Sequence, residues 1–524
     1  MYSLASVSCI HSCEAGLSPR STSYSSTHST ATHALPLPSH FQTHSHFLRY
    51  LLKKPPNPTF PHSTFSMAKL IFLLLFLLHP HRTRSDQSIE PGQDCSGRRI
   101  HILDLPSRFN ADVLRHCAAF PLSDTGDFCS YLPNHGLGPR THSSAQSWYR
   151  TDPRLFEPFF HRRLLLDYPC LSPDPNLSDA VFLPYYASLD ALPFLYSAPL
   201  FNSSALHGQP LAEFLRSRFP RLLSRRLGHD FFLVLAGVAW DYSQDPNADP
   251  VSWGTSFLRL PDFVNFTILT IESRHWPWQE HAVPHPTSFH PSSLTRLTAW
   301  LSRAAKSPRP NLMLFAGGGA TAAAAITPPS RPNIRASILA ECANRTDLCA
   351  LVDCSGGSCS HDPIRYMRPM LRARFCLQPP GDTPTRRSTF DAIVAGCIPV
   401  FFEDVSAKTQ YGWHLPKSTF EEFSVLIPKE EVVFGGVKIA DVLAALPEKR
   451  VRSMRAKVLE MAPRVMYRRH GSSEDMRKTK DAFDLAIDGV LRRIKRRVRA
   501  IEDGDPDRIY YEDDDDDGDG GDEG

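Results

Sequence analysis

Two adjacent arginines, Arg386 and Arg387, lie in a polar loop that follows a short apolar run, Phe375 to Leu377. The loop leads into a segment in which apolar residues, among them Phe390 and Ile393, recur at helical spacing. Guanidinium groups near a helix N-terminus bind phosphate oxygens through their charge, and the free backbone N–H groups there add further donors. These residues therefore predict a site that holds a diphosphate.

The stretch that contains this loop, Phe375 to Phe402, predicts a strand, a loop, a helix and a second strand. Pro379-Pro380-Gly381 ends the first strand, and Ser388 and Thr389 are expected to cap the helix. Gly396 stands where a helix C-terminus favours a residue with positive φ, and the buried second strand follows it. This order of elements is typical of a doubly wound α/β unit.

The composition indicates a globular protein with two domains. The chain has 524 residues, enough for two domains of ordinary size and tails. Hydrophobic residues make up 42% and charged residues 22% of it, and the net charge of +3 is too small to indicate a nucleic-acid partner. The 46 prolines favour many loops over a helical bundle.

Strands that alternate with amphipathic segments predict an α/β sheet covered on both faces in residues 95–305. The predicted strands are Ile100–Asp104, Ala180–Leu183, Phe231–Leu235 and Phe266–Ile271. A second α/β unit, residues 311–500, begins with a strand at Asn311–Ala316, contains the arginine loop and ends in helices. We therefore expect two domains of the same class.

The two ends of the chain predict no core. Residues 1–66 are rich in Ser, His, Thr and Pro, and residues 501–524 are acidic and rich in Gly, so both are expected to be disordered. The apolar run at 70–78 is shorter than the roughly 20 residues of a spanning helix, so residues 67–80 predict a signal peptide or a signal anchor. Met67 is then the expected start and the preceding residues a gene-model extension. Anchored and cleaved forms both stay open.

Ten of the twelve cysteines follow residue 90, and four of them cluster: Cys342, Cys349, Cys354 and Cys359. Zinc is one interpretation, but the cluster lacks the paired spacing of a common zinc site. Disulfides in an oxidising compartment are preferred. Four Asn-x-Ser/Thr sequons also indicate the secretory pathway: Asn176, Asn202, Asn265 and Asn344.

Several motifs stand in a consistent order along the chain: DLPSRFN at 104–110, VFLPYYASLD at 181–190, FCLQPPGDTPTRRSTFDAIVAGCIPVFF at 375–402 and TQYGWHLP at 409–416. Together they resemble the motifs of the plant exostosin-type glycosyltransferases, in particular the xyloglucan galactosyltransferase branch, over roughly residues 95–500. Two departures are Pro384, where the family has an aromatic residue, and the Gly/Ala run at 317–329.

The resemblance implies the GT-B architecture, in which two Rossmann-like domains face a cleft. It also implies a single-pass type II protein of the Golgi membrane with a lumenal domain; a soluble protein of the secretory lumen is the alternative. The implied donor is UDP-galactose and the implied acceptor a cell-wall polysaccharide, and no further cofactor is expected.

Transfer of a sugar from a nucleoside diphosphate needs cations at the leaving diphosphate, where charge grows in the transition state. Arg386 and Arg387 suit this role, and at least one of them should contact phosphate. Ser388 is expected to add a hydroxyl donor or to cap the helix. The remaining donor candidates are Asp382 and Glu403, for ribose or sugar hydroxyls, and Gly317, for close approach to phosphate.

Inversion needs a base on the acceptor hydroxyl, and three carboxylates follow predicted strands of the first half: Asp104, Asp241 and Glu272. Each could equally be structural. Aromatic residues that could stack on acceptor sugars are Tyr185, Tyr186, Trp240, Trp253, Trp276 and Trp278. Because no Asp-x-Asp follows a strand, no metal ligand is predicted.

The leading hypothesis is an inverting transferase that moves galactose from UDP-galactose to xylose side chains of xyloglucan. The same family with another donor or acceptor is the nearer alternative, for example UDP-galacturonic acid or UDP-arabinose, and xylan or pectin. A non-catalytic carbohydrate-binding or scaffold protein of the Golgi is the second. Expected partners are the polysaccharide, a Golgi glycosyltransferase complex and, with an uncleaved anchor, the membrane. Arg492–Arg499 is interpreted as a basic helix face, so nucleic acid is not expected.

Overall fold

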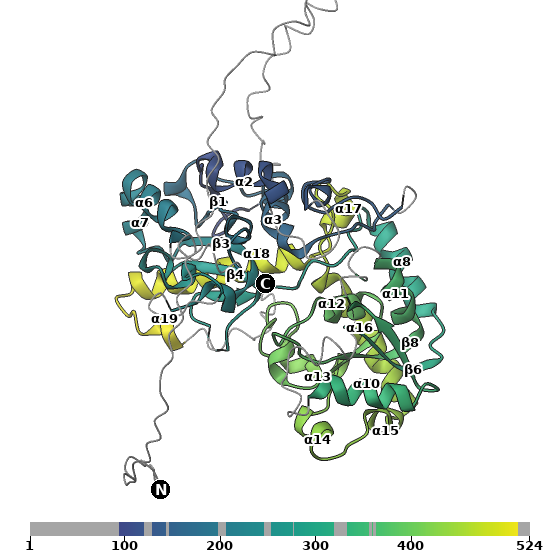
Figure 1. Ribbon diagram of the computed structural model, residues 1–524. Coiled ribbons are helices and arrows are strands. Elements are labelled where there is room, and N and C mark those ends of the chain that lie inside the picture. Colours follow the sequence, from purple (N-terminus) through teal and green to yellow (C-terminus); the bar gives the residue numbers. More distant parts are fainter. Residues whose placement is uncertain are drawn as a thin grey trace, which may run out of the picture. The chain divides into compact units, whose positions relative to one another are not determined.

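The computed structural model describes residues 94–119, 128–142, 146–196, 206–245, 253–275, 277–318, 333–355, 359 and 363–511 (Figure 1). The expected leader, the segment 67–80, most of the Gly/Ala run and the tail from residue 512 lie outside these ranges. Among the helices that are described, none is both long enough and apolar enough to cross a membrane.

The first half is built on a parallel sheet of five strands in the order of the chain. These are β1 (Ile100–Ile102), β2 (Ala180–Phe182), β3 (Phe231–Val238), β4 (Thr267–Glu272) and β5 (Glu280–Ala282). The four predicted strands are thus confirmed, with shifts of a few residues at their ends. β5 was not predicted, because its sequence, EHA, has no run of β-branched or aromatic residues.

Alternate residues of this sheet enter two separate cores, because successive side chains of a strand point to opposite faces. Phe232 and Val234 lie in one core with α3 (Phe156–Asp167). Phe231 and Leu233 lie in the other core with the helices that follow β2. Those helices are α4 (Ala187–Ala191), α6 (Gln209–Arg218) and α7 (Pro220–Arg225). Two further helices flank this part of the chain: α2 (Ala111–Arg115) lies before β2, and α8 (Leu294–Lys306) lies after β5.

The second half is built on another parallel sheet of five strands, in the order β10-β9-β8-β6-β7. Its strands are β6 (Asn311–Gly317), β7 (Cys349–Asp353), β8 (Ala373–Gln378), β9 (Ile398–Phe401) and β10 (Val425–Leu426). The chain leaves β6 toward β7 on one side and returns to β8 on the other. Ligands of doubly wound sheets bind at the carboxyl ends of the strands at such a switch point, here β6 and β8.

The helices of the second half alternate with these strands or follow them. They are α10 (Ile334–Asn344), α11 (Pro363–Arg372), α12 (Arg387–Val394), α13 (Phe420–Phe423), α14 (Lys429–Val433), α15 (Ile439–Ala444), α16 (Glu448–Val465) and α17 (Glu474–Arg477). Two parallel sheets with helices confirm the predicted α/β class with two Rossmann-like halves, the GT-B type.

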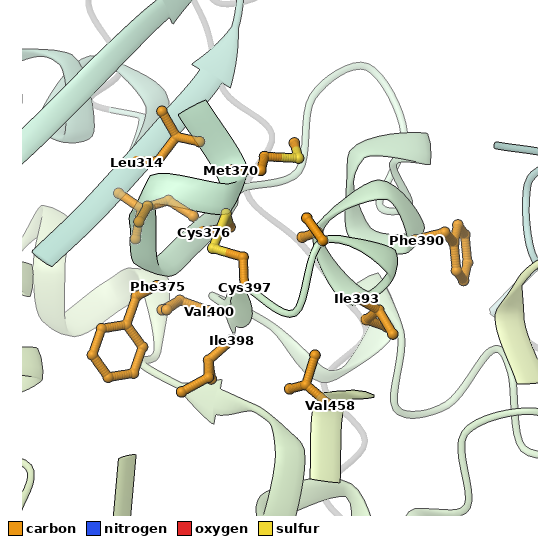
Figure 2. Close-up of a cluster of buried hydrophobic side chains, with 14 of the residues drawn as sticks. Leu314, Met370, Phe375, Cys376, Phe390, Ile393, Cys397, Ile398, Val400 and Val458 are labelled. Atoms are coloured by element: carbon orange, nitrogen blue, oxygen red, sulfur yellow. A yellow bond between two sulfur atoms is a disulfide. The ribbon is translucent and has the colours of Figure 1, made fainter. Parts of the chain in front are cut away.

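The predicted strand, loop, helix and strand of the arginine stretch are β8, its loop, α12 and β9. Figure 2 shows the apolar side chains of this unit around the disulfide between Cys376 of β8 and Cys397, which directly precedes β9. Gly396 has a φ of +64° after the end of α12, as predicted. The predicted caps are wrong: α12 begins at Arg387, with Arg386 as N-cap and no side-chain cap, because Ser388 and Thr389 already belong to the first helical turn.

The long helix α18 (Ala482–Glu502) follows the second sheet in the chain but packs in the core of the first. In Figure 1 it lies, in yellow, with β3 and β4. Its Phe483 and Ile487 join the apolar core that contains Phe182 and Phe232. Chain order alone had assigned this stretch to residues 311–500, because an amphipathic helix does not reveal which sheet it covers.

Two further predictions are decided at the cysteines and at the C-terminal tail. All ten cysteines after residue 90 form disulfides: Cys95–Cys170, Cys117–Cys129, Cys342–Cys349, Cys354–Cys359 and Cys376–Cys397. The disulfide interpretation is therefore confirmed over zinc. The prediction of disorder from residue 501 is wrong for its first part, because α18 ends at Glu502 and α19 spans Arg508–Tyr511.

The Cys376–Cys397 disulfide closes a loop with a sequence separation of 21 residues. We expect replacement of both cysteines by alanine to lower the free energy of unfolding by about 3 kcal/mol, because the unfolded chain regains that loop's entropy. Chemical denaturation of the folded protein measures it. The matched control is the double replacement at Cys354 and Cys359, which span only five residues and should cost less. Equal losses in the two variants would contradict the prediction.

Candidate functional site

Asp241 and Glu272 meet at one edge of the first sheet. Glu272 is the last residue of β4, and Asp241 lies in the short 3-10 helix Ala239–Tyr242 directly after β3. Because β3 and β4 are parallel neighbours, their carboxyl ends lie side by side. Asp104, the third candidate base, follows β1 and is exposed, two strands away from β3. The fold therefore brings two of the three candidates together.

Glu272 is fully buried and is held by the arginine loop of the second half. The Thr385 backbone N–H and hydroxyl donate to its Oε2 at 2.8 and 2.5 Å. Its Oε1 is buried and accepts no hydrogen bond from the residues that the structure describes. Burial raises the pKa of Glu272, and the Thr385 hydrogen bonds oppose that shift. Glu272 therefore joins the two halves of the site through its Oε2.

Asp241 has the environment of a general base. Burial raises its pKa to about 6, the hydrogen bond from the Tyr196 hydroxyl opposes the shift, and the negative charges of Glu272 and Asp382 add to it. Asp382 belongs to the arginine loop of the second half, and its charge acts on Asp241, so Asp241 lies within electrostatic range of that loop. A carboxylate with a pKa of about 6 is ionised at neutral pH yet more basic than an ordinary aspartate.

The two adjacent arginines point in different directions. The Arg387 guanidinium donates to the Thr151 carbonyl at 2.9 Å and to the Ser288 hydroxyl at 2.6 Å, and lies 3.6 Å from the Asp391 carboxylate. Arg386 stays in its own loop, where it donates to the Thr385 carbonyl at 2.7 Å and to Asp382 at 2.8 Å. Arg387 therefore anchors the loop to other segments, whereas these contacts of Arg386 stay within its own loop.

The remaining donor candidates lie around the same strand ends with partners of their own. The Ser388 hydroxyl donates to Gln378 Oε1 at 2.6 Å, and Glu403, after β9, forms an ion pair with Lys429. Gly317 ends β6, and a side chain there would meet the Phe315 ring. Asp382 is 81% exposed at its side chain.

Aromatic residues of the first half divide into buried and exposed ones. Trp240 and Trp253 are exposed, and both lie beside Asp241: Trp240 precedes it, and the N–H of Thr255 in the Trp253 loop donates to the Asp241 carbonyl at 2.7 Å. Tyr185 and Tyr186 are buried, and the Trp278 indole N–H donates to the Val264 carbonyl. Trp276 lies outside the described residues. Among the described candidates, Trp240 and Trp253 are thus the exposed aromatic residues near Asp241.

Comparison with known proteins identifies the family. The model of the exostosin GT47 domain matches residues 94–443, more than half of the chain. The chain belongs to the exostosin GT47 family. It is accordingly a glycosyltransferase, and the resemblance drawn from its motifs is confirmed.

Relatives of this GT47 chain are Arabidopsis thaliana proteins. "Probable xyloglucan galactosyltransferase GT19" is 59% identical over 80% of this chain and 95% of its own length. "Xyloglucan galactosyltransferase MUR3" is 34% identical over 80% of this chain and 65% of its own length. "Xyloglucan-specific galacturonosyltransferase 1" is 32% identical over 78% of this chain and 59% of its own length. The chain thus falls in the branch of the plant xyloglucan galactosyltransferases.

Three residues of the GT47 site were not predicted from the sequence. Thr385 holds Glu272, Tyr196 donates to Asp241, and Arg335, at the start of α10, donates to the Pro380 carbonyl at 2.8 Å. Only Arg335 had a usable signal, because Pro332-Asn333 marks a helix start and so places an arginine in a first turn. The other two depend on contacts between distant segments.

Removal of the Arg387 side chain should destabilise the protein. Its partly buried guanidinium compensates the buried carboxylate of Asp391, so Arg387→Ala leaves that carboxylate without its cation and should lower the free energy of unfolding by roughly 3–5 kcal/mol. Denaturant unfolding measures the change. Arg386→Ala is the matched control, and it should change stability much less, because its ion-pair partner Asp382 is exposed to water. Equal stabilities of the two variants would refute the assignment of Arg387 as the anchor.

Proposed function

We propose that this GT47 protein transfers galactose from UDP-galactose to xylose side chains of xyloglucan, with inversion at the anomeric carbon. The observation that carries the proposal is the contact between Glu272 and Thr385, which joins the arginine loop of the second sheet to the end of β4, beside the buried Asp241 that follows β3. The names of the relatives supply the substrate class.

In the proposed reaction the acceptor hydroxyl oxygen attacks the anomeric carbon of the donor sugar from the face opposite the diphosphate. The bond between that carbon and the diphosphate oxygen breaks, and its electron pair leaves with UDP. Asp241 takes the proton of the attacking hydroxyl, and Arg386 stabilises the negative charge that grows on the diphosphate. Trp240 and Trp253 would support the acceptor chain beside Asp241.

Incubation of the purified protein with UDP-galactose and xyloglucan oligosaccharides tests the reaction. We expect a product larger by one hexose, with the anomeric configuration opposite to that in the donor. The galacturonosyltransferase among the relatives makes UDP-galacturonic acid the second donor to try. If only UDP-galacturonic acid acts as donor, that sugar replaces galactose in the proposal. If the protein transfers no sugar from any UDP-sugar, the proposal is overturned.

The role of Asp241 predicts a pH dependence. A base must be deprotonated, so kcat/KM should fall as the pH drops through about 6, the pKa to which burial raises this carboxyl. Asp241→Asn should lower kcat by roughly 10²- to 10⁴-fold at neutral pH, which initial rates measure. Tyr196→Phe removes a hydrogen bond that favours the ionised form, so the acid limb should move to higher pH.

Asp104→Asn is the control for the pH experiment, since it makes the same change at an exposed carboxylate two strands away. Its rate and pH profile should match those of the unaltered enzyme. An Asp241→Asn enzyme with full activity, or an acid limb that ignores Tyr196→Phe, would remove Asp241 as the base.

The proposed compartment is the lumen of the secretory pathway, with the Golgi membrane as the site of action. Five disulfides support it, because such bonds persist in oxidising compartments and are rare in the cytosol. Of the sequon asparagines, Asn176 and Asn344 are exposed and accessible to glycosylation. A shift in mass of the plant-expressed protein after glycosidase treatment would support this location.

A further inference from the structure

Arg335 lies at the switch point of the second sheet. It belongs to the first turn of α10, which follows β6, and its Nε donates at 2.8 Å to the carbonyl of Pro380 in the loop that follows β8. β6 and β8 are parallel neighbours, so the start of α10 and the arginine loop meet at their carboxyl ends. The tertiary structure thus brings Arg335 to Arg386, 51 residues later in the chain.

Gly381 lies under both guanidinium groups. A Cβ atom at this position would stand 1.7 Å from Arg386 Nη2 and 2.9 Å from Arg335 Nη2. The absence of a side chain therefore lets two cationic groups approach the same point of the backbone. Both groups are only partly exposed.

The two positive charges are poorly compensated. Arg386 pairs with the exposed Asp382 at 2.8 Å, and the described part of the chain offers Arg335 no carboxylate at ion-pair distance. Burial lowers the pKa of Arg335, and the charge of Arg386 lowers it further. Two like charges held together in this way cost free energy in the empty site, and a bound anion would recover it.

We propose that Arg335 is a second phosphate-binding residue, which with Arg386 holds the diphosphate of the nucleotide sugar over Gly381. The identity of the ligand as a uridine nucleotide rests on the proposed function, whereas the binding of a diphosphate anion rests on the two arginines alone. A diphosphate carries enough oxygens for both guanidinium groups, each of which binds phosphate through two parallel N–H groups. Asp382 would then release Arg386 to the ligand, because an exposed ion pair is weak.

Calorimetric titration of the full-length protein with UDP, uridine and inorganic pyrophosphate tests the proposal. Arg335→Ala should weaken binding of UDP and of pyrophosphate at least tenfold and leave uridine affinity unchanged. Arg335→Lys keeps the charge but loses the planar guanidinium, so its affinity for UDP and pyrophosphate should lie between those of the unaltered protein and of Arg335→Ala. The affinity of Arg335→Ala for UDP should also depend less on salt concentration.

The matched control is Arg345→Ala at the other end of α10, where Arg345 lies near the exposed Asp347 and Asp441. It should bind all three ligands like the unaltered protein. Gly381→Ala should displace the Arg386 guanidinium and weaken UDP and pyrophosphate in the same way. Thermal unfolding identifies any variant that fails to fold. If Arg335→Ala does not fold, the affinities of Arg335→Lys and Gly381→Ala for UDP and pyrophosphate decide whether this site binds phosphate.

Each outcome separates this proposal from the function it rests on. Binding of UDP and pyrophosphate that Arg335→Ala leaves unchanged overturns the role of Arg335, while sugar transfer would still stand. Pyrophosphate binding that depends on Arg335, without UDP binding, supports the phosphate site and refutes the uridine donor. A protein that binds neither ligand overturns both.

Discussion

The contact between Glu272 and Thr385 decides how the two halves of the site face each other. Glu272 ends a central strand of the first sheet, and Thr385 belongs to the arginine loop of the second. Burial of a carboxylate costs free energy unless hydrogen bonds compensate the lost hydration. Movement of the loop away from Glu272 would remove those hydrogen bonds and so destabilise the protein. The Tyr411 hydroxyl, which donates to the Ile271 carbonyl at 2.9 Å, reinforces the same contact one residue earlier in β4. The proposed base and the arginine loop are therefore held in one arrangement.

Charge is distributed around this contact in a way that suits sugar transfer. On the side of the first sheet, burial raises the pKa of Asp241 and makes it a better proton acceptor. On the side of the second sheet, Arg386 pairs with the exposed Asp382, and Arg335 has no carboxylate at ion-pair distance among the described residues. Proton acceptance at one end and anion stabilisation at the other are what transfer from a diphosphate requires. The two groups belong to different sheets, so neither half could supply both.

Most strands, the disulfides and several candidate site residues were predictable from the sequence, because each depends on a local pattern. Strand periodicity and turn residues located β1 to β4, β6, β8 and β9, and the arginine stretch identified its own strand, loop, helix and strand. The cysteine count and spacing favoured disulfides over zinc. The candidate list also contained Asp241 and Arg386, because carboxylates after strands and arginines before a helix follow from general rules of α/β sheets.

The amino-acid sequence by itself determined the α/β class, the position of the arginine loop and the family, since each resides in a continuous segment. Only the tertiary structure decided which of the candidates meet. It turned Arg387 toward Thr151 and kept Arg386 within its own loop. It engaged Glu272 with Thr385, while Asp241 accepts a hydrogen bond from the Tyr196 hydroxyl. It also placed α18 on the first sheet and Arg335 beside Gly381. The reason is physical: burial, pKa and ion pairing depend on neighbours from distant segments, and those neighbours are brought together only when the two sheets pack.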